Sequence, residues 1–333
     1  MSVMLLKQAT ASTSVPRLLR TPAVTEFPAA VGEAGQVLFD QTIPRHLVHR
    51  AAVSEVFLTD LRVTDETTFQ VGAQWPRDHS FYRLQSPERH DPMLLAETIR
   101  QAVLLIAHQV FEVPLDWKFV SLEKTCGVTA EGLETDGRPA NILLSMTCHD
   151  VKRTKRGVTG MRVEIGCYRD GVRIGGGELR WSCVPPATYS RLRGGRDKEI
   201  ADAGKPGVPV PGHLIGRERS RDVVLSPMLG GNTWQLRIDQ THAVLFDHPV
   251  DHVPGMVLME AARQAALLTV GEPDALPVRC SFTFDRYVEL DAPTIVTART
   301  AAPVTRGSQG VQVVFEQESS TVATGLLDMM VVC

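Results

Sequence analysis

The sequence lacks the patterns that are typical of metal-binding, redox or membrane proteins. None of its six cysteines lies in a CxxC pair, and no Cys/His cluster has the spacing of zinc ligands. No segment approaches the ~18 consecutive apolar residues of a membrane span, and residues 1–11 lack the hydrophobic core of a signal peptide. The glycines at 175–177 precede no helix pattern, which excludes a dinucleotide fingerprint. We therefore expect a cytoplasmic protein without a metal ion or redox cofactor.

Neither sign of charge is in large excess. The net charge is −3, so nothing global favours a nucleic acid or an anionic membrane as partner, and no helix-turn-helix pattern supports DNA contact. The basic run at 152–156 is either a solvated hairpin turn or a patch that docks an acidic carrier protein or a phosphate. The 333 residues, 43% of them hydrophobic, supply enough apolar material for one large core or two modest ones.

An internal repeat predicts the architecture. Residues 93–102 read MLLAETIRQA, and residues 256–265 read MVLMEAARQA. Met, Leu, Glu, Arg, Gln and Ala recur in the same order at a constant offset of 163 positions, as from Glu97 to Glu260. The same offset relates His79 to His242. A duplicated sequence predicts two copies of one structural unit.

Each copy combines one helix with several strand-like runs. Alternating stretches at 69–75 and 234–239 precede the helices. The runs that follow lie at 117–125, 142–149, 161–168, 172–182, 280–289, 294–300, 311–317 and 321–332, and Asp170-Gly171 is a hairpin turn signal. Because both helices are apolar around nearly their whole circumference, we expect a sheet to wrap each one. This pattern predicts an α+β double hotdog, with two repeats that each fold an antiparallel sheet around a long central helix.

The predicted domain boundaries follow from this repeat. We expect a weakly structured N-terminus at 1–35, an N-terminal hotdog at 36–184, a Gly- and Pro-rich linker at 185–219 and a C-terminal hotdog at 220–333. Two hotdogs in one chain can pair as single hotdogs do in homodimers. The protein is therefore expected to be a monomeric pseudo-dimer or a homodimer.

The candidate catalytic residues lie on the two helices. Glu260, Arg263 and Gln264 stand at i, i+3 and i+4 and share one helical face. The first helix repeats the arrangement with Glu97, Arg100 and Gln101. Buried charges need partners, so each set is either a structural ion pair that pins the helix to the sheet or a catalytic group in a cleft.

The segment before the second helix favours function. Residues 246–255 read FDHPVDHVPG. A helix start offers free backbone N–H groups and the positive end of a dipole, which can polarise a thioester carbonyl, and a nearby His or Glu can move protons. We expect His248 to act in catalysis, although single histidines can equally satisfy backbone groups. The expected substrate-binding residues are His79, Asp251, His252, Gly255 and Met256.

Two further histidines, His46 and His49, lie in the run PRHLVHR near a strand start. Surface or structural roles are expected for both.

These motifs resemble those of a known family. Residues 246–265, with their Asp-His pairs, Pro-Gly and the Glu-Ala-Ala-Arg-Gln run, resemble the signature of the A-factor biosynthesis hotdog family. So do His49-Arg50 with Glu55-Val56, and the run FDRYVEL at 284–290. The resemblance spans roughly residues 40 to 332. More distantly, the Pro-Gly-helix-Glu pattern is similar to hotdog dehydratases of fatty-acid synthesis, although the loop here is shorter and richer in His and Asp.

The resemblance implies an acyltransferase of bacterial, chiefly actinomycete, signalling. Members of the family transfer a β-ketoacyl group from acyl carrier protein to dihydroxyacetone phosphate. The ester can close by an aldol-type condensation to a butenolide, γ-butyrolactone or furan signal precursor that controls antibiotic production. No metal or redox cofactor is required for this reaction.

A mechanism follows as a hypothesis. Glu260 or His248 takes the hydroxyl proton, and backbone N–H groups near Gly255 polarise the carbonyl. Arg263 or Arg100 binds the phosphate, and Gln264 orients the acyl oxygen. Replacing Glu260 with Gln should then abolish product formation and preserve the fold.

Two alternatives stay open at this point. The chain could be a hotdog acyl thioesterase or dehydratase, or a non-catalytic acyl-ligand-binding regulator. Whether one or both halves are catalytic is also open.

Overall fold

The structure is a computed structural model that describes residues 36–228 and 230–331. The N-terminus predicted to be weakly structured, 1–35, lies outside the described residues. No helix in the described ranges is long and apolar enough to cross a membrane.

The first half is one antiparallel sheet around one helix. Its elements are β1 (Leu58–Val63), β2 (Thr68–Trp75), α1 (Met93–Gln109), β3 (Lys118–Val128), β4 (Ala140–Thr154), β5 (Gly157–Arg169) and β6 (Val172–Val184). The strands pair in the order β1-β2-β4-β5-β6-β3. The turn between β5 and β6 is Asp170-Gly171, and both residues have positive φ, 51° and 78°, as a two-residue hairpin requires.

The second half repeats this arrangement. It comprises β7 (Leu225–Pro227), β8 (Thr233–Leu236), α3 (Gly255–Val270), β9 (Leu276–Phe284), β10 (Thr294–Ala301), β11 (Gln309–Gln317) and β12 (Ser320–Met330). The strand order β9-β12-β11-β10-β8-β7 is that of the first half read from the other end. The double hotdog predicted from the repeat is therefore confirmed.

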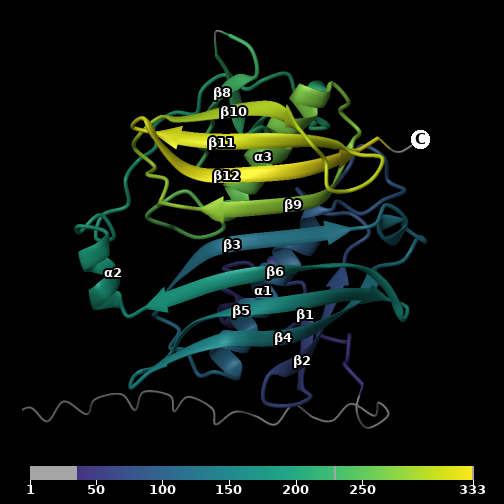
Figure 1. The fold of residues 1–333 in the computed structure, drawn as a ribbon, viewed down its shortest axis with the longest axis vertical. Coiled ribbons are helices and arrows are strands. Elements are labelled where there is room, and N and C mark those ends of the chain that lie inside the picture. Colours follow the sequence, from purple (N-terminus) through teal and green to yellow (C-terminus); the bar gives the residue numbers. More distant parts are fainter. Residues whose placement is uncertain (1–35, 229, 332–333) are drawn as a thin grey trace, which may run out of the picture. The chain divides into compact units, whose positions relative to one another are not determined.

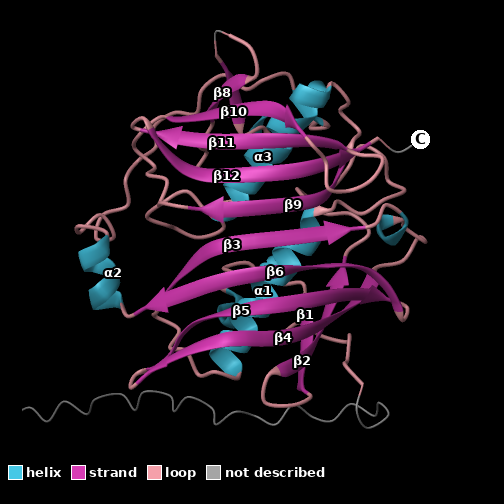
Figure 2. Cartoon of the chain, viewed as in Figure 1, coloured by secondary structure: helices cyan, strands magenta, loops and turns pink. Residues whose placement is uncertain are grey.

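The two sheets join into one. β3 pairs antiparallel with β9, with Cys126 opposite Cys280, and this pairing completes a 12-stranded sheet. Both central helices lie against the same face of that sheet, α1 behind the first half and α3 behind the second (Figures 1 and 2). Because the sheet wraps them, Met93–Ile99 of α1 and Met256–Leu267 of α3 are buried throughout.

The helix ends follow their local sequence. Asp91 Oδ1 accepts a hydrogen bond from the Met93 N–H at 2.9 Å, which satisfies a free donor of the first turn. α3 begins directly after Pro254 and ends at Gly271, which takes the left-handed conformation with φ 79° that closes many helices.

Short turns and one further helix complete the chain. The 3₁₀ turns are η1 (Arg45–Val48), η2 (Val53–Glu55), η3 (Glu131–Leu133), η4 (Gly212–Ile215) and η5 (Ser220–Asp222). Helix α2 (Pro186–Leu192) lies in the stretch between the halves, beside the ends of β3 and β6 (Figure 1).

Several strand boundaries differ from the prediction: β4 continues to Thr154 rather than 149, and β9 begins at Leu276 rather than 280. The end of β9 is the difference that bears on the site. β9 ends at Phe284 rather than near residue 289. The backbone N–H groups of Asp285 and Arg286 both turn to the Val322 carbonyl, at 2.9 and 3.1 Å. Residues 285–289 therefore form a loop, and this loop lines the cavity described next.

Candidate active site

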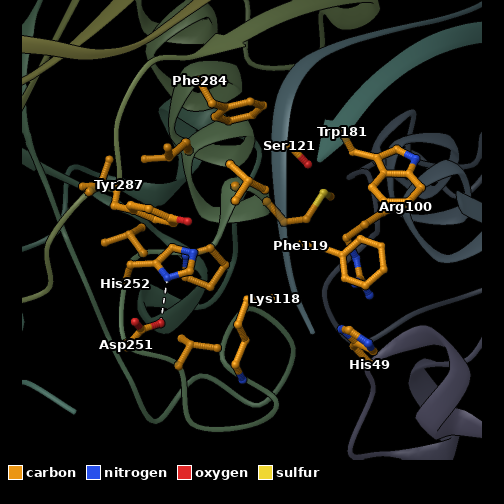
Figure 3. Close-up of a pocket in the computed structure, with 18 of the residues that line it drawn as sticks. His49, Arg100, Lys118, Phe119, Ser121, Trp181, Asp251, His252, Phe284 and Tyr287 are labelled. Carbon is orange, nitrogen blue, oxygen red and sulfur yellow. Dashed lines mark hydrogen bonds and ion pairs between the residues drawn. The ribbon is translucent and has the colours of Figure 1, made fainter. Parts of the chain in front are cut away.

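A cavity of about 1160 Å³ is lined by residues of both halves. Its walls come from α1, the start of β3, the end of β6, α2, the loop at 244–254, the first turns of α3 and the loop after β9. Figure 3 shows His252, Asp251 and Tyr287 on one side of it and His49, Arg100 and Phe119 on the other, with Lys118 between them. Polar groups thus face each other across an otherwise apolar space.

The Glu260 set forms a closed buried network. Glu260 Oε1 accepts hydrogen bonds from Gln264 Nε2 at 2.6 Å and Arg263 Nη2 at 2.7 Å, and from Arg217 Nη2 at 2.9 Å. Burial alone would raise the pKa of Glu260, but Arg217 and Arg263 lower it to about 2. Glu260, Arg263 and Gln264 are at most 2% exposed, and none of the three is among the described residues that line the cavity.

The Glu97 set repeats this network in the first half. Glu97 Oε1 accepts from Arg50 Nη2, Arg100 Nη2 and Gln101 Nε2, each at 2.7 Å. Burial opposes the charge of Glu97, but Arg100 and Arg50 hold its pKa well below the ordinary value. Of the helix residues predicted to be catalytic, Arg100 alone lines the cavity as the structure describes it, with its side chain 25% exposed.

The arginines of these networks cross between the halves. Arg50 Nη1 donates to the Val244 carbonyl at 2.9 Å, and Arg217 Nη1 donates to the Phe81 carbonyl at 2.6 Å. The residues at 81 and 244 are equivalent in the repeat. Each network therefore fixes its own helix and also holds a loop of the other half.

The polar contacts of His79 are with nearby backbone groups and one buried carboxylate. Its Nδ1 accepts hydrogen bonds from the Phe81 and Tyr82 N–H groups at 3.1 and 3.0 Å, and its Nε2 lies 3.4 Å from Glu55. In the other half, His242 Nδ1 likewise accepts hydrogen bonds from the Val244 and Leu245 N–H groups at 3.2 and 3.1 Å. His79 is 9% exposed and is outside the described lining of the cavity, so the structure separates it from the other predicted substrate-binding residues.

The loop before α3 places an acid–histidine pair in the cavity wall. Asp251 Oδ1 and His252 Nδ1 are 2.9 Å apart. Because a carboxylate only accepts, the proton of a neutral His252 is assigned to Nδ1, which leaves the lone pair of Nε2 as a base. The His252 side chain is 28% exposed and lines the cavity.

Helix α2, which lies between the two halves in the sequence, positions the Asp251–His252 pair together with the residue that follows it, Arg193. The Tyr189 hydroxyl donates to Asp251 Oδ2 at 2.8 Å, and Arg193 Nε donates to the same oxygen at 3.1 Å. Arg193 also pairs with both oxygens of Glu289 at 2.6 and 2.7 Å. Burial would raise the pKa of Asp251, but the hydrogen bonds from His252 and Tyr189 and the charge of Arg193 keep it well below its ordinary value. Asp251 is therefore an anion that orients His252.

A second acid–histidine pair lies at the rim. Asp247 Oδ1 and His248 Nδ1 are 2.5 Å apart, and the His248 side chain is 44% exposed. The Ala51 N–H donates to Asp247 Oδ2 at 2.8 Å, and Arg50 lies 3.7 Å from its other oxygen. Arg50 thus links Glu97 to the carboxylate that positions His248.

The start of α3 supplies backbone donors. Gly255 and Met256 line the cavity, and the N–H groups of a first helical turn have no intrahelical carbonyl to bond. The loop ahead of them is fixed, because the Val253 N–H donates to the Val288 carbonyl at 2.9 Å. His252 and these donors therefore lie within four residues of one another on a rigid support.

His49 has a place in the cavity wall that the sequence did not indicate. It lines the cavity, with its Nε2 2.8 Å from His108 Nε2 and His108 Nδ1 2.7 Å from the Val113 carbonyl. Burial, followed by the charges of His108 and Arg100, lowers the pKa of His49 to about 3. His49 is therefore half-buried in the cavity wall, whereas His46 is exposed.

Several functional side chains were missed because they come from segments without a motif. Tyr189 and Arg193 belong to the stretch that was predicted to be a linker. Arg50 and Arg217 precede the segments that the offset of 163 aligns. A longer alignment of the halves would have found the arginines, because IPRHLVHR at 43–50 matches VPGHLIGR at 210–217. No comparable signal marks Tyr189.

The fold and the cavity define a double-hotdog protein with an acid–histidine site built between its halves. Residues 36–185 and 200–333 match the A-factor biosynthesis hotdog domain, and the chain belongs to this family.

Curated relatives support this membership. The chain is 42% identical over 293 residues to a 2-oxo-3-(phosphooxy)propyl 3-oxoalkanoate synthase of Streptomyces virginiae, covering 86% of this chain and 97% of that protein. A synthase of the same description from Streptomyces coelicolor is 37% identical, covering 84% and 89%. Among solved structures, the fold is similar to a candidate oleoyl thioesterase from Lactobacillus plantarum, with a TM-score of 0.50, 11% identity and coverage of 81% and 98%.

Proposed function

We propose that this chain is an acyltransferase that joins a β-ketoacyl group, carried as a thioester on acyl carrier protein, to the hydroxyl of dihydroxyacetone phosphate. The product is a phosphorylated ester that can close to a butenolide, γ-butyrolactone or furan signal precursor. The observation that carries the proposal is the Asp251–His252 pair, held beside the first turn of α3 in a cavity of about 1160 Å³. Its relatives are described as synthases of 2-oxo-3-(phosphooxy)propyl 3-oxoalkanoate, which is a phosphorylated ester of this kind.

The chemistry needs a base and an oxyanion site. His252 Nε2 takes the proton from the acceptor hydroxyl as its oxygen attacks the thioester carbonyl. The backbone N–H groups of Gly255 and Met256 stabilise the oxyanion of the tetrahedral intermediate. When the C–S bond breaks, His252 returns the proton to the departing thiolate, so that ester and free thiol leave together.

The remaining residues have supporting roles in this proposal. Leu104, Phe119, Trp181 and Met259 line the cavity and offer the hydrocarbon tail an apolar surface. His248 contacts the incoming substrate at the rim. Glu97 and Glu260, with Arg263, Gln101 and Gln264, hold helices and loops in place and do not touch the reacting atoms.

The substrates fit a cytoplasmic protein, since carrier-bound acyl chains and triose phosphates are made in that compartment. A monomer suffices, because the pairing of β3 with β9 already joins two hotdogs as a dimer would. The boundaries 36–184, 185–219 and 220–333 are proposed for the two hotdogs and the connecting stretch.

The test is incubation of the protein with a β-ketoacyl thioester and dihydroxyacetone phosphate, read by mass spectrometry and thiol release. We expect one phosphate-bearing ester for each thiol. His252→Gln should lose at least about a hundredfold in rate, the contribution of a general base, whereas His213→Gln, at an exposed histidine, should match wild type.

Other products would overturn the proposal. Free β-keto acid without phosphate would identify a thioesterase, and a dehydrated acyl chain would identify a dehydratase. Tight acyl-ligand binding without turnover would identify a regulator.

A further inference from the structure

The cavity has a counterpart in the other half, and the counterpart is almost closed. Its volume is about 10 Å³, and Gly216, Arg217, Leu84 and Gln85 line it. Gly216-Arg217 correspond to His49-Arg50 in the match between 43–50 and 210–217, and Leu84-Gln85 correspond to Asp247-His248 at the offset of 163. The arginine persists in both copies, but Gly216, Leu84 and Gln85 stand in the closed copy where the open cavity has His49, Asp247 and His248.

His49 takes a backbone conformation that suits glycine. It caps η1 in the left-handed region with φ 51°, and Gly216 caps η4 with φ 65°. Its partner His108 likewise corresponds to a glycine, Gly271. A residue other than glycine held in this region carries strain, and such strain is typical of functional positions. The pair His49–His108 is therefore a feature of the open cavity that the scaffold does not require.

The hydrogen bonds fix which nitrogen of His49 keeps an unshared lone pair. The Val113 carbonyl can only accept, so His108 carries its proton on Nδ1 and accepts on Nε2. His49 Nε2 must then donate, and His49 Nδ1 has a lone pair with no protein partner among the described residues. His49 is half-buried and lines the cavity, and this lone pair is the one that its ring has left for a ligand.

The groups around that nitrogen are cationic. Arg100 from α1 and Lys118 from β3 both lower the pKa of His49 through their charge, whereas His108 is neutral in this pattern of hydrogen bonds. The carboxylates close by are already paired, Glu97 with Arg50 and Arg100, and Asp247 with His248. Arg100 Nη1 has no hydrogen-bond partner in the part of the chain that the structure describes. This end of the cavity therefore carries an excess of positive charge, which a bound anion would neutralise.

We propose that His49, Arg100 and Lys118 form the subsite for the phosphate of a small phosphate monoester, and that His49 Nδ1 takes up a proton when the dianion binds. The identity of the acceptor rests on the proposed function. A dianion beside the bare lone pair of Nδ1 is repelled, whereas it turns a protonated Nδ1 into a charge-assisted donor. The proton comes from solvent. The subsite and His252 lie on opposite sides of the same cavity (Figure 3).

Calorimetric titration of the full chain tests the subsite, with dihydroxyacetone phosphate and separately inorganic phosphate as titrants. The measurement is made at about pH 7.5, where a phosphate with a second pKa near 6 is mostly dianionic. Comparing buffers of different ionisation enthalpy counts protons. We expect wild type to take up protons when phosphate binds, since Nδ1 is bare before binding.

Three variants sharpen the test. Asn tolerates the left-handed conformation, so His49→Asn should fold, bind phosphate more weakly and take up no proton. Lys118→Met should weaken phosphate binding roughly tenfold, the loss of one charge-assisted contact, and leave dihydroxyacetone binding unchanged. Lys155→Met, at an exposed lysine of the basic hairpin, should behave as wild type.

The outcomes separate this proposal from the reaction. Absence of proton uptake by wild type, the same uptake in His49→Asn, or an unchanged affinity in Lys118→Met would overturn the subsite even if ester is formed. Phosphate binding with proton uptake but no acylation of dihydroxyacetone phosphate would support the subsite and contradict the proposed function.

Discussion

Glu260 neutralises two buried arginines, and this decides what its replacement does. In Glu260→Gln, Arg217 and Arg263 stay buried without their carboxylate. Removing one member of a buried ion pair costs about 3–5 kcal/mol, so we expect a marked fall in melting temperature by calorimetry. Glu123→Gln, at the exposed pair with Arg180, is the matched control and should melt like wild type. A Glu260→Gln protein with normal stability and no turnover would instead return Glu260 to the chemistry.

The same carboxylate makes stability depend on acid pH. The pKa of Glu260 falls from 4.5 to about 2 on folding, and that of Glu97 also falls. Their stabilisation is present above pH 4.5 and is lost as the pH drops towards 2. Urea midpoints measured across this interval should decline in wild type and decline less in Glu260→Gln. Equal slopes for the two proteins would show that Glu260 is not the titrating group.

At the scale of elements, α2 connects the stretch between the halves to the acid–histidine pair. Tyr189→Phe removes a donor to Asp251 without changing the ring, and the orientation of His252 then depends on Arg193. Loss of such a supporting hydrogen bond typically costs 10–100-fold in activity, and we expect a fall in kcat with little change in KM and an altered pH profile. Ser190→Ala on the same helix is the control. An unchanged pH profile would mean that Tyr189 only packs.

The helices and most strands could be predicted from their patterns. The repeat located α1 and α3, and alternation located strands such as β2, within a few residues of their observed ends. The positions of β1 and β7 were not predicted, because β7 has only three residues and neither strand has a distinct alternating pattern. The end of β9 was misplaced because a hydrogen-bonded turn at Val322, distant in sequence, stops the strand.

The site was harder to predict, because it depends on which polar groups reach each other. The Glu-Arg-Gln pattern signals a buried charge in either a scaffold or a cleft. Arg217, remote in sequence, completes the buried network around Glu260, and no pattern links the two residues. His49 and His108 are 59 positions apart, and no spacing rule joins them. The loop at 246–255, which lines the cavity, could be singled out from the sequence because a helix start, two histidines and two acids coincide there.

At the scale of the whole molecule, the halves share one sheet and one core. The core cluster of buried residues extends from Ile43 to Met329, and Arg50 and Arg217 each hold a loop of the opposite half. We therefore expect calorimetry to show one cooperative unfolding transition, with equal calorimetric and van't Hoff enthalpies. Two resolved transitions would show that the hotdogs unfold independently.

The covalent link between the halves has a genetic consequence. When two copies of one short gene product assemble, every mutation is imposed on both sites at once, and neither can specialise. Here one gene encodes both, so the segment at 244–256 can be selected for turnover while its twin at 81–93 is selected for stability alone. Substitutions that would ruin a symmetric enzyme can accumulate in one copy without harm to the other.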